Sequence, residues 1–282
     1  MAKRADDARE KEQSPGISHK DAIDQPPRKK SKNAFSELMS KKSSTPNSDP
    51  RSALTTKLRA TGTVMSGRDG LLAYIKNPQN FASSSLISYD DNWVLIRDLY
   101  PKSSVHLLLL PRNPKLYNAH PYVACKDAAF LAAAKVEIEK ARVIVASELR
   151  RLYGKDSVSE HARRKAMESE DPPEVLPEGR DWSKEVMTGV HANPSMNHLH
   201  FHILSKDRYS PSLKHRKHYN SFNTRFFVPV EDLPLNEDDE RHGAGRFLSD
   251  DMTCWRCGKN FKNQFAKLKP HLEEEFQAWK KE

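Results

Sequence analysis

The sequence predicts an α+β fold, with helices packed on an antiparallel sheet and a small module near the C-terminal end. Several short apolar segments have the composition of strands, and most connections between them are short. Short connections favour antiparallel neighbours, because parallel strands need a long crossover. Only residues 127–153 have the length and apolar spacing of a long helix. A C-x-x-C pair close to residue 255 indicates the terminal module.

The composition indicates a basic protein of the intracellular type. The 282 residues carry a formal net charge of +9. A positive excess favours a polyanionic partner, nucleic acid first, although a basic solvated surface gives the same excess. No apolar run approaches the roughly 18–20 residues that span a bilayer, and the charged N-terminus lacks the apolar centre of a signal peptide. We therefore expect a soluble protein without a membrane partner.

Residues 1–55 are polar and rich in Lys, Ser, Pro and Asp. Such a segment buries too little apolar area to offset the entropy of ordering, so we expect a disordered basic tail. The cluster PPRKKSK, Pro26–Lys32, is a candidate nuclear-import signal and predicts a nuclear location. The apolar island Asn33–Met39 is a candidate binding segment for a repair-protein partner.

The elements that follow the tail can be predicted in order. Residues 69–78 predict a short helix that Pro78 ends, because proline has no amide hydrogen to continue it. Residues 85–90 and 93–98 predict two strands around an Asp-Asp-Asn turn. Residues 104–112 are apolar enough to form a central strand, and Gly154 is placed to end the long helix.

The second half of the chain begins with a charged stretch that contains prolines, residues 155–184, which predicts a surface insertion. Strand patterns return at residues 186–190 and 197–204, and residues 225–230 predict a last short strand. We expect residues 231–250 to link to the terminal module. The predicted domains are a catalytic domain over residues 65–232 and the terminal module over residues 233–282.

The segment HLHFHIL, His198–Leu204, is the most informative stretch. Side chains of a strand alternate between its faces, so His198, His200 and His202 should share one face. Imidazole titrates near neutrality, so one ring can attack phosphorus while a protonated neighbour stabilises phosphate oxygens. Two alternatives stay open: the three imidazoles bind a metal, or they form a polar face without a function.

The surroundings of this strand resemble a known family. The segments Gly189–Asp207, which contains HANPSMNHLHFHIL, Ser210–Thr224 and Ile96–Arg112 resemble the histidine-triad superfamily and, within it, the aprataxin family. The terminal module resembles the zinc finger of the fungal-type members. The resemblance covers residues 65 to 280 or so and is most specific in the HANPSM and triad stretch. It implies a histidine-triad fold and a DNA-repair hydrolase.

The resemblance also implies roles for the histidines. His200 matches the nucleophile, which attacks the phosphorus of AMP joined to a DNA 5′-phosphate and forms an adenylyl-histidine. His191 matches the residue that protonates the leaving phosphate oxygen, and His202 matches a residue that contacts phosphate. His198 matches a residue that orients its neighbours.

Further positions are carried over from the family in the same way. Asp98 matches the position that meets the ribose hydroxyls, and Leu99 flanks the adenosine. The expected pocket and phosphate contacts are Lys102, His106, Ser195, Lys214 and Lys217. The expected DNA contacts follow the catalytic strand, in a basic loop with aromatic residues suited to stacking: His218, Tyr219 and Phe222.

The terminal module has the residues of a small zinc site. Cys254 and Cys257 precede His271 by a thirteen-residue gap, and a second histidine at the usual spacing is missing. Glu275 lies one helical turn after His271 and can supply an oxygen ligand. Glu273, Glu274 or a water are alternatives, as is a C-x-x-C pair without metal. A closed set of four ligands predicts a structural Zn²⁺, on a helix that we expect Pro270 to begin.

Three functions are compatible with these patterns. The first is an enzyme that removes AMP from abortively ligated DNA 5′ ends, at nicks, ends or RNA–DNA junctions, in single-strand break repair. The second is a general histidine-triad hydrolase of small adenylated molecules. The third is a DNA-binding module with a degenerate catalytic site, which the complete set of histidines disfavours. We expect a monomer.

Overall fold

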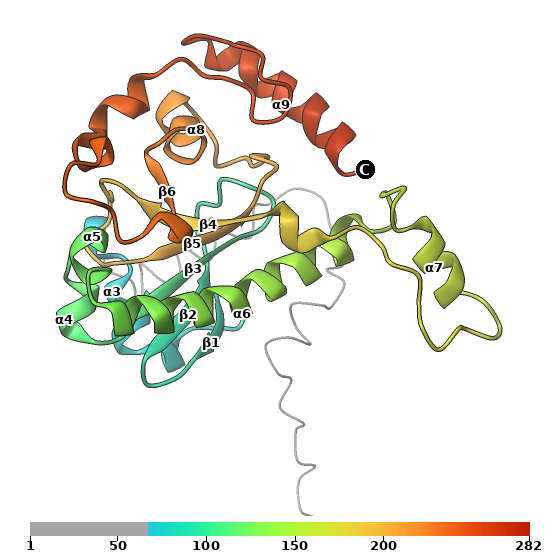
Figure 1. Cartoon of the computed structure of the whole chain (residues 1–282), viewed down its shortest axis with the longest axis horizontal. Coiled ribbons are helices and arrows are strands. Elements are labelled where there is room, and N and C mark those ends of the chain that lie inside the picture. Colours follow the sequence, from blue (N-terminus) through green and yellow to red (C-terminus); the bar gives the residue numbers. More distant parts are fainter. Residues whose placement is uncertain (1–66) are drawn as a thin grey trace, which may run out of the picture. The chain divides into compact units, whose positions relative to one another are not determined.

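The computed structural model describes residues 67–282 (Figure 1), all of which belong to one compact unit. The predicted basic tail, the import signal and the apolar island lie outside the described residues. Among the described helices, none is long and apolar enough to cross a membrane.

Six antiparallel strands form one sheet in the order β1-β2-β3-β5-β4-β6. The predicted antiparallel sheet is therefore confirmed, and β3 is central, with a strand paired on each side. The strands are β1 Leu86–Tyr89, β2 Trp93–Arg97, β3 His106–Pro111, β4 Val186–His191, β5 Phe201–Ser205 and β6 Phe227–Pro229.

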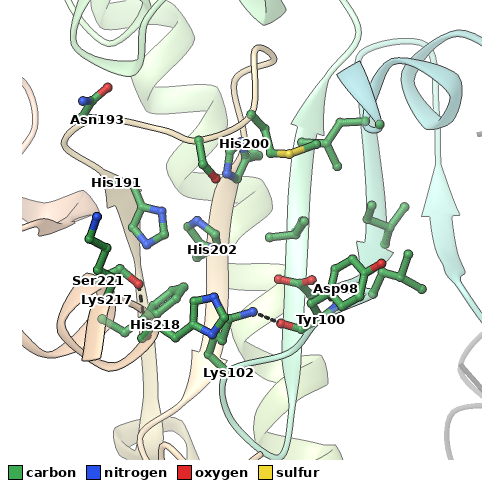
Figure 2. Close-up of a pocket in the computed structure, with 18 of the residues that line it drawn as sticks. Asp98, Tyr100, Lys102, His191, Asn193, His200, His202, Lys217, His218 and Ser221 are labelled. Atoms are coloured by element: carbon green, nitrogen blue, oxygen red, sulfur yellow. Dashed lines mark hydrogen bonds between the residues drawn. The ribbon is translucent and has the colours of Figure 1, made fainter. Parts of the chain in front are cut away.

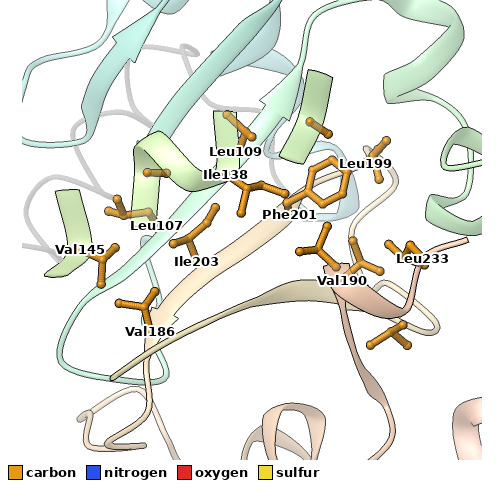
Figure 3. Close-up of a cluster of buried hydrophobic side chains, with 14 of the residues drawn as sticks. Leu107, Leu109, Ile138, Val145, Val186, Val190, Leu199, Phe201, Ile203 and Leu233 are labelled. Carbon is orange, nitrogen blue, oxygen red and sulfur yellow. The ribbon is translucent and has the colours of Figure 1, made fainter. Parts of the chain in front are cut away.

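The long helix α6, Ala128–Tyr153, crosses one face of the sheet (Figure 1). The side chain of Asp127 accepts hydrogen bonds from the first free amides and so fixes where the helix begins. Figure 3 shows Ile138 of α6 packed near side chains of β3 and β5, such as Leu107 and Phe201, in the main core. This core buries the face of the sheet that lies against α6.

The opposite face of the sheet carries the N-terminal helical turns. Leu108 and Leu110 of β3 point away from α6 and pack in a second cluster with Leu71, Tyr74 and Ile75. The helix predicted over residues 69–78 is divided into η1, Gly67–Asp69, α3, Leu72–Lys76, and η2, Pro78–Asn80. Two short helices, α4 Pro114–Tyr117 and α5 Pro121–Ala124, connect β3 to α6.

The strand of the histidines begins later than predicted. β5 starts at Phe201 rather than at residue 197. The amide of Leu199 donates to the carbonyl of Tyr117 in α4, at 2.8 Å, instead of to a neighbouring strand. The chain from Ser195 to His200 is therefore not part of the sheet. As a result, the side chains of His198 and His200 have different neighbours.

Gly189 allows β4 to approach β6 closely. A Cβ atom at this position would meet the carbonyl oxygen of Val228 and the ring of Phe227. β6 is only three residues long, and it pairs with β4 from Gly189 to His191. A change in the spacing of the two strands at Gly189 would therefore also move the part of β6 that lies beside His191.

The predicted insertion contains a short helix, α7, His161–Met167, and a 3-10 turn, η3, Trp182–Glu185. Figure 1 shows α7 and the loop after it projecting from the body of the unit. The base of the insertion is held by two buried residues, Glu160 and Arg180. Glu160 accepts a hydrogen bond from the Trp182 indole at 2.7 Å.

The C-terminal part contains α8, Arg216–Asn223, two 3-10 segments, η4 Val230–Asp232 and η5 Glu240–Ser249, and the helix α9, Phe265–Trp279. Pro270 lies inside α9 and not in its first turn, so that prediction was wrong. The helix begins more than one turn earlier, at Phe265, because Leu268 and Leu272 both pack into the core of the terminal module.

Candidate active site and metal centre

A cavity of about 480 Å³ opens on the face of the sheet that carries the N-terminal turns. Figure 2 shows Asp98 and Tyr100 on one side, Lys217 and Ser221 on the other, and His191, His200 and His202 between them. Of the residues predicted from the sequence, its walls contain Asp98, Leu99, Lys102, His191, Ser195, His200, His202, Lys217, His218 and Phe222. The topology therefore brings together three segments, residues 96–102, 191–202 and 217–222.

His200 is held in one tautomer. Its Nδ1 lies 2.7 Å from the carbonyl oxygen of His198. A carbonyl only accepts, so Nδ1 carries the hydrogen and Nε2 keeps its lone pair. Burial lowers the pKa of His200 below its ordinary value. The ring that lines the cavity is therefore neutral and nucleophilic at neutral pH.

His202 is supported by His106, which lies behind the cavity wall. The Nε2 of His106 is 3.0 Å from the Nδ1 of His202. The amide of Lys102 donates to the Nδ1 of His106 at 3.2 Å, so neutral His106 donates through Nε2. Burial lowers the pKa of His106 to about 4, so that the ring is neutral. The Nε2 of His202 then carries a hydrogen, and this atom is buried without a partner.

Asp98 lies at the mouth of the cavity, beside this pair of imidazoles. One carboxylate oxygen accepts the amide of Tyr100 at 2.7 Å. The other lies 3.3 Å from the Nδ1 of His106, which already accepts the amide of Lys102 and has no hydrogen to donate to Asp98. The carboxylate is partly exposed and lines the cavity, so this oxygen can accept a hydrogen bond from a ligand hydroxyl.

His191 ends β4 and faces His202, with 4.4 Å between the ring centroids. Burial lowers its pKa well below the ordinary value, and the neighbouring His200 adds to this lowering. A hydrogen bond with the backbone of Ser221 opposes the shift. Its Nε2 is buried and unpaired, as is the Nε2 of His202.

These polar atoms suit an anion. Ligand nitrogens of His191, His200 and His202 lie within 4.8 Å of one another, which admits a phosphate group or a metal ion between them. Lys102 and Lys217 also line the cavity. Burial lowers the pKa of Lys102, and the nearby carboxylate of Asp98 opposes this lowering.

The other end of the cavity is apolar and suits a planar base. It is lined by Leu71, Tyr74, Ile96, Leu108 and Met196. Sequence patterns did not mark these residues as functional, because each has the spacing of an ordinary core position. The remaining lining residues that were not predicted are Gly67, Gly70, Arg97, Tyr100, Asn193, Ser221, Phe226 and Leu248.

Several predicted residues lie elsewhere. His198 is buried outside the cavity wall, with its ring 5.5 Å from that of Tyr117. The predicted shared face for all three triad histidines was therefore wrong, although the carbonyl of His198 orients His200. Lys214 is exposed and does not line the cavity. His218 does line it, and burial lowers its pKa to about 4.

Tyr219 differs most from its prediction. Its side chain is fully buried, so no ring face is available to stack on a nucleic acid. Its hydroxyl donates to the carbonyl of Thr253 at 2.8 Å and accepts the amide of Trp255 at 3.0 Å. Tyr219 therefore joins α8 to the terminal module. Phe222 is also buried, but its ring lines the cavity 4.6 Å from His191.

The terminal module brings four candidate metal ligands together: Cys254, Cys257, His271 and Glu275, with ligand atoms within 4.8 Å of one another. The Sγ of Cys257 and one carboxylate oxygen of Glu275 each lie 3.2 Å from the Nε2 of His271. These separations fit the edges of a tetrahedral Zn²⁺ site. The other oxygen of Glu275 accepts from Arg256 at 2.7 Å, which fixes the carboxylate.

Comparisons with known proteins agree with this geometry. The model of the HIT domain, the histidine-triad domain, matches residues 79–209. The model described as a C2HE / C2H2 / C2HC zinc-binding finger matches residues 223–278. The aprataxin-like protein of Schizosaccharomyces pombe is 37% identical over 212 residues, which cover 75% of this chain and 82% of the relative.

The chain belongs to the aprataxin family. The aprataxin-like protein of Saccharomyces cerevisiae is 36% identical over 221 residues, which cover 76% of this chain and 98% of the relative. The structure of the aprataxin ortholog Hnt3 in complex with DNA superposes with a TM-score of 0.61 at 34% identity. That match covers 75% of this chain and 96% of the other.

Membership of the aprataxin family confirms the predicted fold, an α+β histidine-triad domain with a C-terminal zinc finger of the fungal type. A second structure, Hnt3 in complex with DNA and guanosine, superposes with a TM-score of 0.60 at 33% identity. The predicted structural Zn²⁺ agrees with the finger model and with the ligand cluster.

Proposed function

We propose that the protein is a DNA 5′-adenylate hydrolase, which removes AMP from abortive ligation intermediates in single-strand break repair. The observation that carries the proposal is the hydrogen bond from the Nδ1 of His200 to the carbonyl of His198. It leaves a neutral, in-cavity Nε2 as the nucleophile, beside two unpaired imidazole nitrogens that suit phosphate oxygens.

In the first step, the Nε2 of His200 forms a bond to the AMP phosphorus. The bond from that phosphorus to the bridging oxygen breaks, and the oxygen leaves on the DNA 5′-phosphate. His191 supplies a proton to it, because the negative charge of the bound substrate raises the pKa of this imidazole. The Nε2–H of His202 donates a hydrogen bond to a non-bridging oxygen of the AMP phosphate.

In the second step, water attacks the phosphorus of the adenylyl-histidine. His191, which lost its proton in the first step, takes a proton from this water. The bond from phosphorus to the Nε2 of His200 breaks, AMP leaves and His200 returns to its neutral form. Asp98 holds the ribose hydroxyls and Leu99 flanks the adenosine, which places the base in the apolar end of the cavity. Ser195, Lys102 and Lys217 contact the phosphates, and charge near the phosphorus is the main contribution that such a site makes to phosphoryl transfer.

DNA as the partner is supported by relatives whose structures are described as complexes with DNA and by the net charge of +9. Exposed lysines lie on the finger at Lys259, Lys262 and Lys267. The nuclear location, the repair partner of the tail, the monomeric state and the domain limits at residues 65–232 and 233–282 are part of the same proposal.

The test uses duplex DNA with a 5′-adenylate labelled in the AMP, together with the zinc-loaded full chain and its His200→Ala variant. We expect label to be trapped on the wild-type protein during turnover, and AMP release to fall about 10⁴-fold in the variant. Absence of AMP release by the zinc-loaded wild type would contradict the proposal. Turnover of AMP-lysine without turnover of adenylated DNA would favour the second candidate, a general histidine-triad hydrolase of small adenylated molecules.

A further inference from the structure

The zinc finger and α8 are joined by a row of hydrogen bonds from Tyr219, Asn220 and Asn223, called the seam below. They also share one apolar core. Besides the two hydrogen bonds of the Tyr219 hydroxyl, the side-chain Nδ2 of Asn223 donates to the carbonyl of Thr253 at 2.7 Å. The side chain of Asn220 donates to the carbonyl of Asp250 at 2.8 Å. Thr253 and Trp255 flank the metal ligand Cys254, so the seam begins at the metal-binding turn.

The core of the finger is completed by residues from outside it. Leu213 and Tyr219 pack in one cluster with Met252, Cys254, Phe261, Leu268 and Leu272. Lys269 of α9 adds hydrogen bonds to the carbonyls of Ser210 and Leu213, at 2.7 and 2.9 Å. The segment that leads into α8 is therefore fixed at both of its ends by the finger.

The opposite side of α8 forms a wall of the cavity. Lys217, His218, Ser221 and Phe222 all line it. The ring of Phe222 packs on His191 and, at 5.0 Å, on His202. Only two residues separate Tyr219, which is hydrogen-bonded to the finger, from Phe222, which packs on His191.

We propose that the finger acts on the chemistry through α8: Tyr219 and Asn223 are positioning residues that hold Ser221 and Phe222 so that His191 faces the leaving group. The inference rests on the proposed role of His191 as the proton donor. It assigns the seam a function that is separate from contact between the finger surface and DNA. If this is correct, a variant of Tyr219 or Asn223 should slow adenylyl transfer most for substrates whose leaving group needs a proton.

The experiment measures single-turnover adenylyl transfer to His200 from two small substrates. AMP-lysine has a poor amine leaving group that needs a proton, whereas adenosine 5′-(4-nitrophenyl phosphate) releases a stable nitrophenolate that does not. Tyr219→Phe keeps the ring and removes the hydroxyl. We expect it to slow transfer from AMP-lysine roughly tenfold and to leave the nitrophenyl ester within about twofold of the wild type.

Zinc content and the melting temperature are measured on the same samples. If Tyr219→Phe does not fold, Asn223→Ala gives the same test, because it removes only the bond to Thr253. The matched control is Asn263→Ala, at an exposed position of the finger that has no proposed role in catalysis or DNA binding, and we expect both small substrates to react with it as with the wild type. Equal slowing of both substrates by the seam variant, or slowing of neither, would overturn the inference.

The same substrates distinguish a failure of the proposed function from a failure of this inference. A wild type that reacts with both small substrates but not with adenylated DNA would remove the DNA proposal. The leaving-group comparison would still decide the role of the seam, because neither of its substrates contains DNA.

Discussion

The side chain of His200 takes its orientation from the main chain of His198, through a hydrogen bond of 2.7 Å. The imidazole of His198 itself packs against Tyr117, outside the cavity. The proposed nucleophile is therefore oriented by a backbone oxygen that no side-chain substitution removes.

This arrangement predicts unequal effects within the triad. His198→Phe keeps an aromatic ring against Tyr117 and keeps the carbonyl, so we expect adenylyl transfer to stay within about tenfold of the wild type. His200→Ala should lose about 10⁴-fold, because the attacking atom is absent. Rapid-quench measurement of labelled protein compares the two. If His198→Phe is as inactive as His200→Ala, the carbonyl is not sufficient to orient the nucleophile.

The buried imidazole of His106 predicts a loss of stability in acid. Its pKa is lowered from 6.5 to about 4 in the folded protein, so the unfolded chain binds more protons between these values. The free energy of unfolding should therefore fall as the pH drops below 6.5, by up to about 3 kcal/mol at pH 4. Urea unfolding at pH 7.5 and 4.5, with wild type and His106→Gln, measures the contribution. An equal loss in both proteins would show that His106 does not contribute to it.

The fourth zinc ligand can be identified by comparing neighbouring glutamates. Glu275 is buried with its carboxylate fixed by Arg256, whereas the side chain of Glu274 is 80% exposed. We expect Glu275→Ala to speed zinc loss to a chelator by about a hundredfold and to lower the melting temperature. Glu274→Ala should change neither quantity. Equal zinc retention in the two variants would assign the fourth position to another ligand.

Gly189 predicts a steric effect on the sheet. An alanine Cβ would meet the Val228 carbonyl and the Phe227 ring, so β6 must shift away from β4. We expect Gly189→Ala to reduce the free energy of unfolding by about 1–3 kcal/mol. Gly245→Ala is the control, since a Cβ there meets no atom within 4 Å. Chemical denaturation of both variants makes the comparison, and similar stabilities would contradict the prediction.

The regular parts of the fold could be predicted from local patterns. The β-strands and α6 each bury a face whose apolar spacing is visible in the sequence, and Asp127 marks the first turn of α6. The start of β5, which leaves His198 and His200 outside the strand, could not be placed in this way. The contact of Leu199 with Tyr117 in α4 draws the chain off the sheet, and such a long-range hydrogen bond has no local signal.

The proposed catalytic histidines were easier to predict than the residues around them. His191, His200 and His202 stand out by their spacing, and the structure places them around one cavity. Tyr219 and Phe222 have the same aromatic character in the sequence and lie on one helix, yet Tyr219 faces the finger and Phe222 faces the cavity. Which face of α8 meets which neighbour is decided by tertiary packing alone.

The shared core of the seam also decides how this protein can be cut or recombined. Leu213 and Tyr219 fill the interior of the finger from outside the matched finger segment, residues 223–278. A fragment that starts at residue 250 would expose the apolar surface that they cover, and a foreign finger grafted after α8 would meet an unmatched helix. The smallest exchangeable piece of the molecule therefore begins before Leu213, among the residues that follow β5.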